Sequence, residues 1–380
     1  MKFSLAVAVV GIVCFAAADD RQQFEDFKRK FNKVYDSAQE EQKRFDIFQA
    51  SLQRAAASNA GQGELGAAFG VTKFSDLTPQ EFSARLGYRR ANASDFSHPA
   101  APLSVPQDER VQFKDLPSSL DWRTHLGSSR GSAVTTVKDQ GQCGSCWAFS
   151  VAETTESAAF LAGNSLYEFS PQQVASCTPS MFGCGGGDPV PAYESIMSKG
   201  GLSSGWFWPY QQSMYAECLD KPCTAKCSQP DRNFTFARQF PFAEISGYSW
   251  ATPPCETGAK CSQQDLGALA DALVQKGPTS ICLNAGAWQD YTGGILSSKA
   301  CGGNGMDDVD HCVQLVGYHR VFAKPEQSYW IVRNSWSTDW GIDGYIHLQL
   351  DENTCGLANE ASHPTIATEQ ITKNAYRYQH

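Results

Sequence analysis

The sequence predicts an α+β protein in which two subdomains enclose a cleft. An Ala-rich segment with an apolar stripe, residues 146–163, has the pattern of a buried helix that ends at Gly163-Asn164. Four later segments are short, rich in β-branched or aromatic residues and separated by glycine or polar clusters, which is typical of strands. They are PTSICLNA (278–285), HCVQLVGY (311–318), SYWIVRNSW (328–336) and GYIHLQL (344–350).

Residues 1–18 have the pattern of a secretory signal peptide. Lys2 is basic, residues 3–15 are mostly apolar, and three alanines at 16–18 supply the small residues of a cleavage site. The apolar run is short for a membrane span and no later stretch is long enough, so we expect no span. We expect the chain to enter the secretory pathway, where disulfides persist.

Residues 21–60 have the pattern of an amphipathic helical segment. Phe24, Phe27, Phe31 and Tyr35 recur at steps of three and four residues. Residues 91–115 are instead rich in Ala, Ser and Pro and lack periodicity, which predicts an exposed, cleavable linker. This linker contains a glycosylation sequon at Asn92, and a second sequon lies at Asn233.

The formal net charge is -9 and the sequence pI is near 5.3. Nucleic acids and anionic membrane surfaces attract basic proteins, so this charge argues against both as partners.

The stretch DQGQCGSCWAFS, residues 139–150, carries cysteines at 143 and 146. They could be a redox dithiol, half of a metal site, or a nucleophile beside a structural disulfide. Cys146 lies where the 146–163 helix begins, and the positive end of a helix dipole lowers a thiol pKa. A nucleophilic cysteine also needs a histidine base and an acceptor that orients it. His311 at a strand start and Asn334 at a strand end offer both.

Three blocks, QGQCGSCWAF, VDHCVQLVGY and NSWSTDWGIDGY, resemble the active-site blocks of the papain-like, cathepsin L-like cysteine proteases. LPSSLDWR from Leu116 resembles the mature N-terminus of that family. The upstream region resembles its inhibitory propeptide in two motifs, although some positions depart from them. The first motif is matched by Glu40, Arg44, Phe48 and Asn59, with departures at Ser51 and Ala55; the second is GVTKFSD (70–76), with Thr72 in place of the usual Asn.

The resemblance implies a papain-like fold: a helical left subdomain and a β-barrel right subdomain with the active-site cleft between them, after a helical propeptide. The implied divisions are the signal peptide 1–18, the propeptide 19–115, the peptidase domain 116–364 and a C-terminal tail 365–380.

Acid should protonate propeptide carboxylates such as Glu40 and Asp76 and permit cleavage near Asp115. His311 and Asn334 follow Cys146 by 165 and 188 residues (311−146 and 334−146), which implies an insertion within 218–261.

The resemblance also assigns catalytic roles. Cys146 would be the nucleophile and His311 the acid and base, while Asn334 would orient the imidazole. Trp336 would shield the His311–Asn334 hydrogen bond, and the side chain of Gln140 would join the Cys146 backbone N–H in an oxyanion hole.

The substrate-binding residues would surround the same cleft. The glycines at 186 and 187 would let a substrate backbone approach. An apolar pocket wall favours Leu, Val or Phe at the second residue before the scissile bond, P2. A carboxylate at the floor, Glu360, could instead pair with Arg there, unless it is a solvated surface residue. The full set is Gly186, Gly187, Asp188, Pro189, Cys282, Val309, Asp310, Cys312, Trp336 and Glu360. Residues 212–262 contain no histidine of the kind that blocks the cleft of exopeptidase relatives, which favours an endopeptidase.

The cysteine count is consistent with one unpaired thiol. Of 14 cysteines, Cys14 leaves with the signal peptide, and the odd remainder leaves one free thiol or one intermolecular link. The resemblance pairs Cys143 with Cys184, Cys177 with Cys218, and Cys301 with Cys355. We also predict that Cys282 bridges Cys312. The pairing of Cys223, Cys227, Cys255 and Cys261 stays open.

We expect no cofactor and no metal. The expected partners are protein and peptide substrates, the chain's own propeptide and cystatin-like inhibitors, and we expect a monomer located in a lysosome or vacuole or outside the cell. Three other classes stay open: an inactive homologue that acts as a binder or storage protein, a disulfide oxidoreductase in which Cys143 is free, and a transglutaminase-like acyl transferase.

Overall fold

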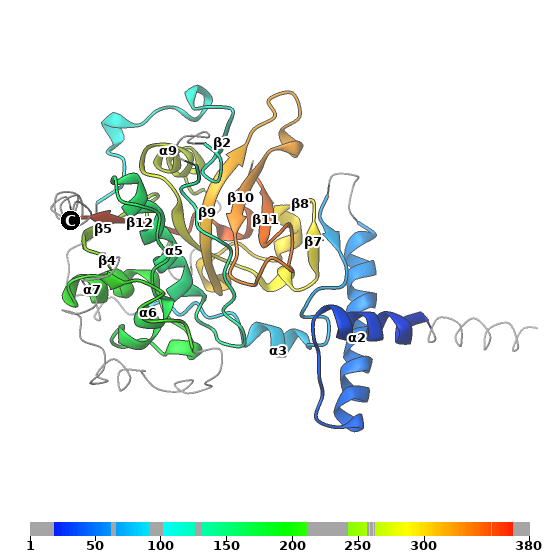
Figure 1. Ribbon diagram of the computed structural model, residues 1–380. Coiled ribbons are helices and arrows are strands. Elements are labelled where there is room, and N and C mark those ends of the chain that lie inside the picture. Colours follow the sequence, from blue (N-terminus) through cyan, green and yellow to red (C-terminus); the bar gives the residue numbers. More distant parts are fainter. Residues whose placement is uncertain are drawn as a thin grey trace, which may run out of the picture.

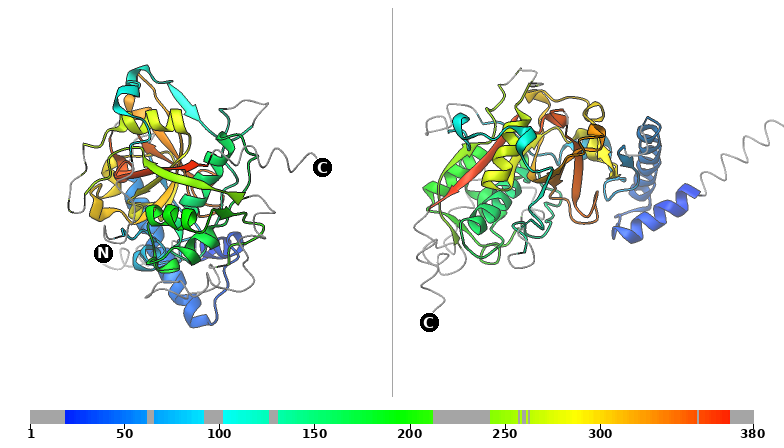
Figure 2. Two further views of the ribbon diagram at one scale, coloured as in Figure 1. Left: turned by 90° about the vertical axis from the view of Figure 1, so that its left-hand side faces the viewer. Right: turned by 90° about the horizontal axis from the view of Figure 1, so that it is seen from above.

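A computed structural model describes residues 19–61, 66–91, 102–125, 131–211, 242–256, 258, 261, 263–350 and 352–367. Within these residues the protein is α+β, and an N-terminal helical region stands against one side of the main domain (Figures 1 and 2). The predicted signal peptide, both sequons, most of the predicted insertion and the residues after 367 lie outside this description. None of the described helices is long and apolar enough to cross a membrane.

The predicted helical segment 21–60 is two helices, not one. The first covers 19–30, and α2 (Ala38–Asn59) crosses it (Figure 1). The predicted helical character is confirmed, and the segment divides in two because Asn32 takes a left-handed conformation (φ 50°) and Ser37 caps α2 by accepting a hydrogen bond from the Glu40 N–H. The crossing buries a cluster of aromatic rings from both helices: Phe24, Phe27, Phe45 and Phe48.

The helical region joins the main domain through a short strand pair. β1 (Ala68–Phe69) pairs antiparallel with β7 (Tyr291–Gly293). The chain then enters α3 (Pro79–Ser83), whose start is fixed by a capping box between Thr78 and Glu81. In Figure 1, α3 lies between the helical region and the helices of the main domain.

The second half of the predicted linker is mostly exposed, as expected, but it is docked at two buried positions. Ser104 and Val105 are buried, and the Ser104 N–H donates to the Trp250 carbonyl at 2.6 Å. Two short 3-10 helices follow, at Gln107–Glu109 and Phe113–Asp115. This segment is held because Leu103 forms a parallel bridge with Trp250.

Helices form one half of the main domain. α5 (Cys146–Leu161) packs on α6 (Pro171–Cys177) and α7 (Pro189–Ser198), and a small pair, β3 (Leu202–Ser203) with β4 (Phe242–Ala243), lies beside them. α5 ends as predicted, because Gly163 has the positive φ of 101° that favours glycine. A 3-10 turn, Gly183–Gly185, precedes α7.

Among the described residues the other half is an eight-stranded sheet, in which the four predicted strands are consecutive neighbours and none lies at an end. The order is β5-β12-β6-β9-β10-β11-β8, with β2 also paired to β9. The bounds are β2 (Ser119–Asp121), β5 (Ile245–Trp250), β6 (Thr279–Leu283), β8 (Ile295–Leu296), β9 (His311–His319), β10 (Tyr329–Arg333), β11 (Tyr345–Gln349) and β12 (Glu360–Ile366). α9 (Leu266–Lys276) packs against β9, and 3-10 turns occur at Gly286–Trp288, Ser298–Cys301, Met306–Asp308, Pro325–Gln327 and Thr354–Gly356.

The structure of this half differs from the prediction in two details. Among the described residues the end strands β5 and β8 do not pair, so the sheet does not close into the predicted barrel. One reason is that β8 is only two residues long and its Ile295 bridges Gly66 of the propeptide region. The last strand, β12, runs to Ile366, two residues past the predicted domain end at 364, because Thr365 and Ile366 pair with β5.

Candidate active site

Cys146 is brought to the junction of the two halves by the start of α5. Its side chain is fully buried, and it is the free cysteine of the described chain. The Cys312 N–H lies 3.5 Å from Cys146 Sγ. Cys312 is the second residue of β9, so the first turn of a helix from one half meets the start of a strand from the other.

His311 and Asn334 form a hydrogen-bonded pair beside this thiol. His311 begins β9, Asn334 follows β10, and His311 Nε2 lies 2.9 Å from Asn334 Oδ1. Asn334 Oδ1 also accepts the Ser335 N–H at 2.8 Å, so it is the acceptor and the imidazole Nε2 is the donor. The neutral ring therefore carries its basic lone pair on Nδ1, which has no hydrogen-bond partner among the described groups. Trp336 stacks on the ring, with centroids 4.8 Å apart.

Gln140 is held in place at the same junction. Its Oε1 accepts the Ser335 hydroxyl at 2.6 Å, while its Nε2 donates to the Cys143 carbonyl at 2.8 Å and to the Arg85 carbonyl at 3.1 Å. The Gln140 side chain is fully buried. An amide donor that is already aimed at a backbone carbonyl can stabilise an oxyanion without first reorganising.

Residues 85–91 run through the cleft and cover these groups. The Tyr88 N–H donates to the Asp310 carbonyl at 2.9 Å, and the Arg89 N–H donates to the Gly187 carbonyl at 3.0 Å. The Gly187 N–H in turn donates to the Gly87 carbonyl at 2.9 Å. Tyr88 and Gly187 thus form a parallel bridge. Sequence reasoning missed this segment, since LGYRRA has no periodicity or motif that marks it.

Coverage keeps the thiol and the imidazole neutral. Burial raises the pKa of Cys146 to about 11, although backbone N–H groups of Cys312, Gly87 and Trp147 partly oppose the rise. Burial lowers the pKa of His311 to about 4, although the bond to Asn334 partly opposes the fall. With residues 85–91 in place, both groups are uncharged between pH 5 and 8.

The side chain of Tyr88 fills a pocket beside Cys146. It packs against an apolar cluster that includes Cys282, Val309 and Cys312. Strand register places Glu360, Cys282 and Cys312 in one row across β12, β6 and β9. The Tyr88 hydroxyl donates to Glu360 Oε2 at the end of this pocket. Glu360 is buried, so the alternative of a solvated surface residue is wrong.

The remaining pocket residues lie at the start of α7. Asp188 caps this helix by accepting the Val190 N–H, and Pro189 is its first residue. Gly186 has a φ of 111°, and a Cβ there would lie 2.9 Å from the Gly87 carbonyl oxygen. A Cβ at Gly187 would instead lie 2.5 Å from the ring of Trp147, so helix packing requires this second glycine.

The other described cysteines form disulfides. The structure pairs Cys143–Cys184, Cys282–Cys312, Cys301–Cys355 and Cys255–Cys261. Cys177 is also disulfide-bonded, and Cys218, its predicted partner, lies outside the described residues. Since Cys143 is bridged, it is not the free thiol that a redox dithiol requires. Within the described ranges no three His, Cys, Asp or Glu side chains gather to hold a metal.

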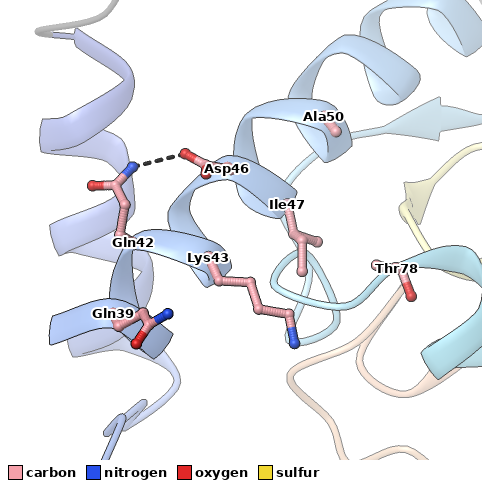
Figure 3. Close-up of a pocket in the computed structure, with 7 residues that line it drawn as sticks. All are labelled: Gln39, Gln42, Lys43, Asp46, Ile47, Ala50 and Thr78. Carbon is pink, nitrogen blue, oxygen red and sulfur yellow. Dashed lines mark hydrogen bonds between the residues drawn. The ribbon is translucent and has the colours of Figure 1, made fainter. Parts of the chain in front are cut away.

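Sequence reasoning also missed the anchor between α2 and the main domain. Arg54 Nε and Nη2 lie 2.5 and 3.0 Å from the two oxygens of buried Asp290, and the Ser51 hydroxyl donates to the same carboxylate at 2.9 Å. A separate pocket on α2, away from the cleft, contains none of the predicted catalytic residues (Figure 3). It is lined by Gln39, Gln42, Lys43, Asp46, Ile47, Ala50 and Thr78.

Comparisons with known proteins agree with this architecture. Residues 116–365 match the papain family cysteine protease model, and residues 24–82 match the cathepsin propeptide inhibitor domain (I29). The chain is 33% identical to a cathepsin L-like proteinase of Phaedon cochleariae over 97% of this chain and 100% of the relative. It is also 33% identical to cysteine proteinase 1 of Dictyostelium discoideum, over 90% of this chain and 92% of the relative.

Solved structures give the same result. Digestive procathepsin L2 proteinase from the larval midgut of Tenebrio molitor superposes with a TM-score of 0.69 at 30% identity, covering 91% of this chain and 99% of that one. Procathepsin L 3 from the same tissue gives 0.67 at 29% identity over the same shares. The chain therefore belongs to the papain family of cysteine proteases and carries a cathepsin-type inhibitory propeptide.

Proposed function

We propose that this protein is the zymogen of a cysteine endopeptidase in which Cys146, His311 and Asn334 cleave peptide bonds through a thioester acyl-enzyme. The observation that carries the proposal is the meeting of one free, buried thiol with a histidine whose Nε2 is fixed by Asn334 at 2.9 Å. This constellation activates a cysteine nucleophile because the histidine can accept its proton while the third residue holds the ring.

The proposed reaction has two halves. Cys146 transfers its proton to His311 and its sulfur attacks the scissile carbonyl carbon, and Gln140 Nε2 with the Cys146 N–H stabilises the oxyanion. The C–N bond then breaks, and His311 gives the proton to the leaving amine. In the second half, His311 takes a proton from water and the hydroxide attacks the thioester carbon. The C–S bond then breaks, the sulfur takes the proton back from His311, and the acid product leaves.

The propeptide supports an inhibitory role through its position. The Arg85 carbonyl accepts from Gln140 Nε2, where the substrate carbonyl would lie, and the Tyr88 side chain fills the pocket proposed for P2. Cleavage near Asp115 would separate the propeptide 19–115 from the mature domain that starts at Leu116. Once it leaves, water re-enters the site, and burial no longer penalises the charge that develops on the imidazole and the sulfur during the reaction.

The proposal also covers the preferred P2 residue, the mode of cleavage and the destination of the protein. The apolar pocket wall favours an apolar P2 residue, and Glu360 gives it a tolerance for Arg. The absence of histidine between 212 and 262 supports endopeptidase action. The pattern of residues 1–18 and the disulfides support synthesis in the secretory pathway, and a lysosome, a vacuole or the outside of the cell as the destination.

The test is to acidify purified zymogen and assay a fluorogenic dipeptidyl substrate with Leu at P2, with and without an epoxide that traps cysteine nucleophiles. We expect activity to appear after acid treatment and to be lost with the epoxide attached to Cys146, as located by peptide mass mapping. The matched control is Cys146→Ser, which should neither hydrolyse nor bind the epoxide. Full activity in that variant, or attachment at another cysteine, would overturn the assignment.

A further inference from the structure

Tyr210, which lies outside the three catalytic blocks, contacts both ends of the loop that leads to Cys146. Its hydroxyl donates to the Gln140 backbone carbonyl at 3.0 Å and lies 2.6 Å from the Ser145 hydroxyl. A phenol has a single proton, so Ser145 is the donor in the second bond. Gln140 carries the side-chain donor of the proposed oxyanion hole, and Ser145 directly precedes Cys146, whose N–H is the other donor. One phenol oxygen therefore joins the two residues that set the positions of both donors.

The Ser145 hydroxyl serves this contact instead of a more usual one. Ser145 is the N-cap residue of α5, where a serine side chain ordinarily accepts a hydrogen bond from an N–H group of the first helical turn. Here the side chain makes no capping bond, and the hydroxyl of this fully buried residue is bonded to Tyr210. The start of α5 is thus tied to Tyr210 by a side chain.

Tyr210 is itself held by the start of α6 and by α5. The Trp208 carbonyl accepts the Ser170 hydroxyl at 2.6 Å, and the N–H of the residue after Tyr210 donates to Gln172 Oε1 at 2.7 Å. The Tyr210 ring packs edge to face on Phe149 of α5, with centroids 4.7 Å apart. A hydroxyl held in this way can position its partners with the precision that catalysis needs.

The phenol stays protonated where the enzyme works. Burial raises the pKa of Tyr210, although the bond to Ser145 partly opposes the rise. Negative charge on Asp139 or Cys146 raises this pKa further. The bridge between Gln140 and Ser145 therefore persists through a reaction in which Cys146 loses and regains its proton.

We propose that Tyr210 is a positioning residue for the oxyanion hole, whose hydroxyl fixes the Gln140 side chain relative to the Cys146 N–H. The inference rests on the peptidase function proposed above. Donors stabilise a developing charge best when they are in place before it forms. Ser335 holds Gln140 from the sheet half through its backbone carbonyl and its hydroxyl, and Tyr210 supplies the matching contact from the helical half.

A positioning role differs from a general stabilising role in the reaction that it affects. An oxyanion forms when the thiol attacks a peptide carbonyl. None forms when iodoacetamide alkylates the same thiol, because the sulfur then displaces iodide at a saturated carbon. Loss of the Tyr210 hydroxyl should therefore slow peptide hydrolysis and leave alkylation of Cys146 unchanged. Tyr210→Phe is the suitable replacement, because it keeps the ring that packs on Phe149 and removes only the hydroxyl.

The experiment measures both reactions on the same preparations. Enzyme is matured from each full-length zymogen with a trace of pepsin, which pepstatin then inhibits, so that maturation does not depend on the activity of the variant. We expect Tyr210→Phe to lower kcat for a dipeptidyl amide substrate with Leu at P2 about two- to tenfold, the value of one neutral hydrogen bond. KM and the rate of Cys146 alkylation should stay within about twofold of wild type, as for an interaction made in the transition state.

Further variants separate the bridge from the loss of a buried hydroxyl in general. Tyr318→Phe also removes a hydroxyl that donates to one backbone carbonyl, that of Pro117, but at the end of β9 opposite His311, and it should leave kcat unchanged. Ser145→Ala breaks the other bond of the bridge and should also lower kcat.

A double variant tests the route through Gln140. In a Gln140→Ala background, Tyr210→Phe should have much less effect on kcat than it has alone, because the donor that it positions is absent. An unchanged kcat in Tyr210→Phe, equal losses of kcat and alkylation rate, or fully multiplicative effects with Gln140→Ala would overturn the positioning role. Failure of the matured wild-type enzyme to cleave the substrate would instead overturn the peptidase proposal.

Discussion

Loss of the Arg54 anchor should loosen the propeptide without touching the active site. Arg54 contacts both oxygens of Asp290, a residue 4% exposed, and Asp290 also accepts the hydroxyl of fully buried Ser51. In Arg54→Gln the buried Asp290 carboxylate has no cation beside it while the propeptide is docked, which is the closed state. Once the propeptide lifts away, in the open state, water hydrates the same carboxylate. Hydrogen bonds to charged groups contribute about 1.5–3 kcal/mol. The open fraction should therefore rise roughly 10- to 150-fold, since each 1.36 kcal/mol is tenfold.

Cys146 provides the assay, because it is buried under the propeptide and is the free thiol of the described chain. At neutral pH, a neutral alkylating reagent should reach it only through transient opening of the intact zymogen. When closing is faster than labelling, the labelling rate follows the open fraction. The alkylation rate of Arg54→Gln zymogen, divided by that of the wild type, thus measures the anchor directly.

A matched control and a double variant make this measurement decisive. Lys43→Gln removes the same charge from the same helix at an exposed position, and it should leave the rate unchanged. Asp290→Asn should also speed labelling, and adding Arg54→Gln to it should give much less than the product of the two effects. A change below threefold in Arg54→Gln, or fully multiplicative effects, would refute the reasoning.

Three further predictions follow. Gly87→Ala should speed alkylation of the zymogen, because its Cβ would overlap the Gly144 carbonyl, whereas Gly61→Ala meets nothing within 4 Å and should not; equal rates would contradict the fit. Gln140→Ala should lower kcat of the mature enzyme by about 10²–10³, and a loss confined to KM would remove it from the oxyanion hole. The protection factors of the amides of residues 85–91 in a Cys146→Ser zymogen, that is, exchange rates corrected for the intrinsic pH dependence of exchange, should fall between pH 6.5 and 4, and adding His311→Gln should flatten that fall; identical pH slopes would exclude His311 as the cause.

Local patterns in the sequence predicted the elements that carry the chemistry. The helix at Cys146 and the strand at His311 follow from periodicity and β-branched composition, and both begin at the residues that the active site needs. The two-helix form of residues 19–59 was not predicted, because it depends on one left-handed residue, Asn32, inside an otherwise continuous apolar pattern. Single-residue backbone conformations leave little trace in composition.

Contacts between distant segments could not be predicted in the same way. Tyr88 meets Glu360 across 272 positions of sequence, and Arg54 meets Asp290 across 236. Such pairs depend on how the propeptide docks, which no local pattern encodes. Gly187 was predicted to let a substrate backbone approach; in this structure its N–H bonds the Gly87 carbonyl of the propeptide, and the ring of Trp147 is what excludes a Cβ.

The propeptide restrains the enzyme by occupying the cleft and also by excluding water from His311 and Cys146. Burial lowers the pKa of His311 to about 4 in the covered form, below the ordinary histidine value near 6.5, so hydration of the ring on opening favours binding of the proton. The stability of the closed form is thus fully present above pH 6.5 and is lost as the pH falls through 4. The Cys146 thiol does not contribute to this pH dependence between pH 4 and 6.5. Its pKa rises from 9.0 to about 11 on burial, so its ionisation affects the closed form only at alkaline pH. Acid therefore acts on the imidazole of His311, and in the proposed mechanism the group that carries the proton during catalysis also favours removal of its cover.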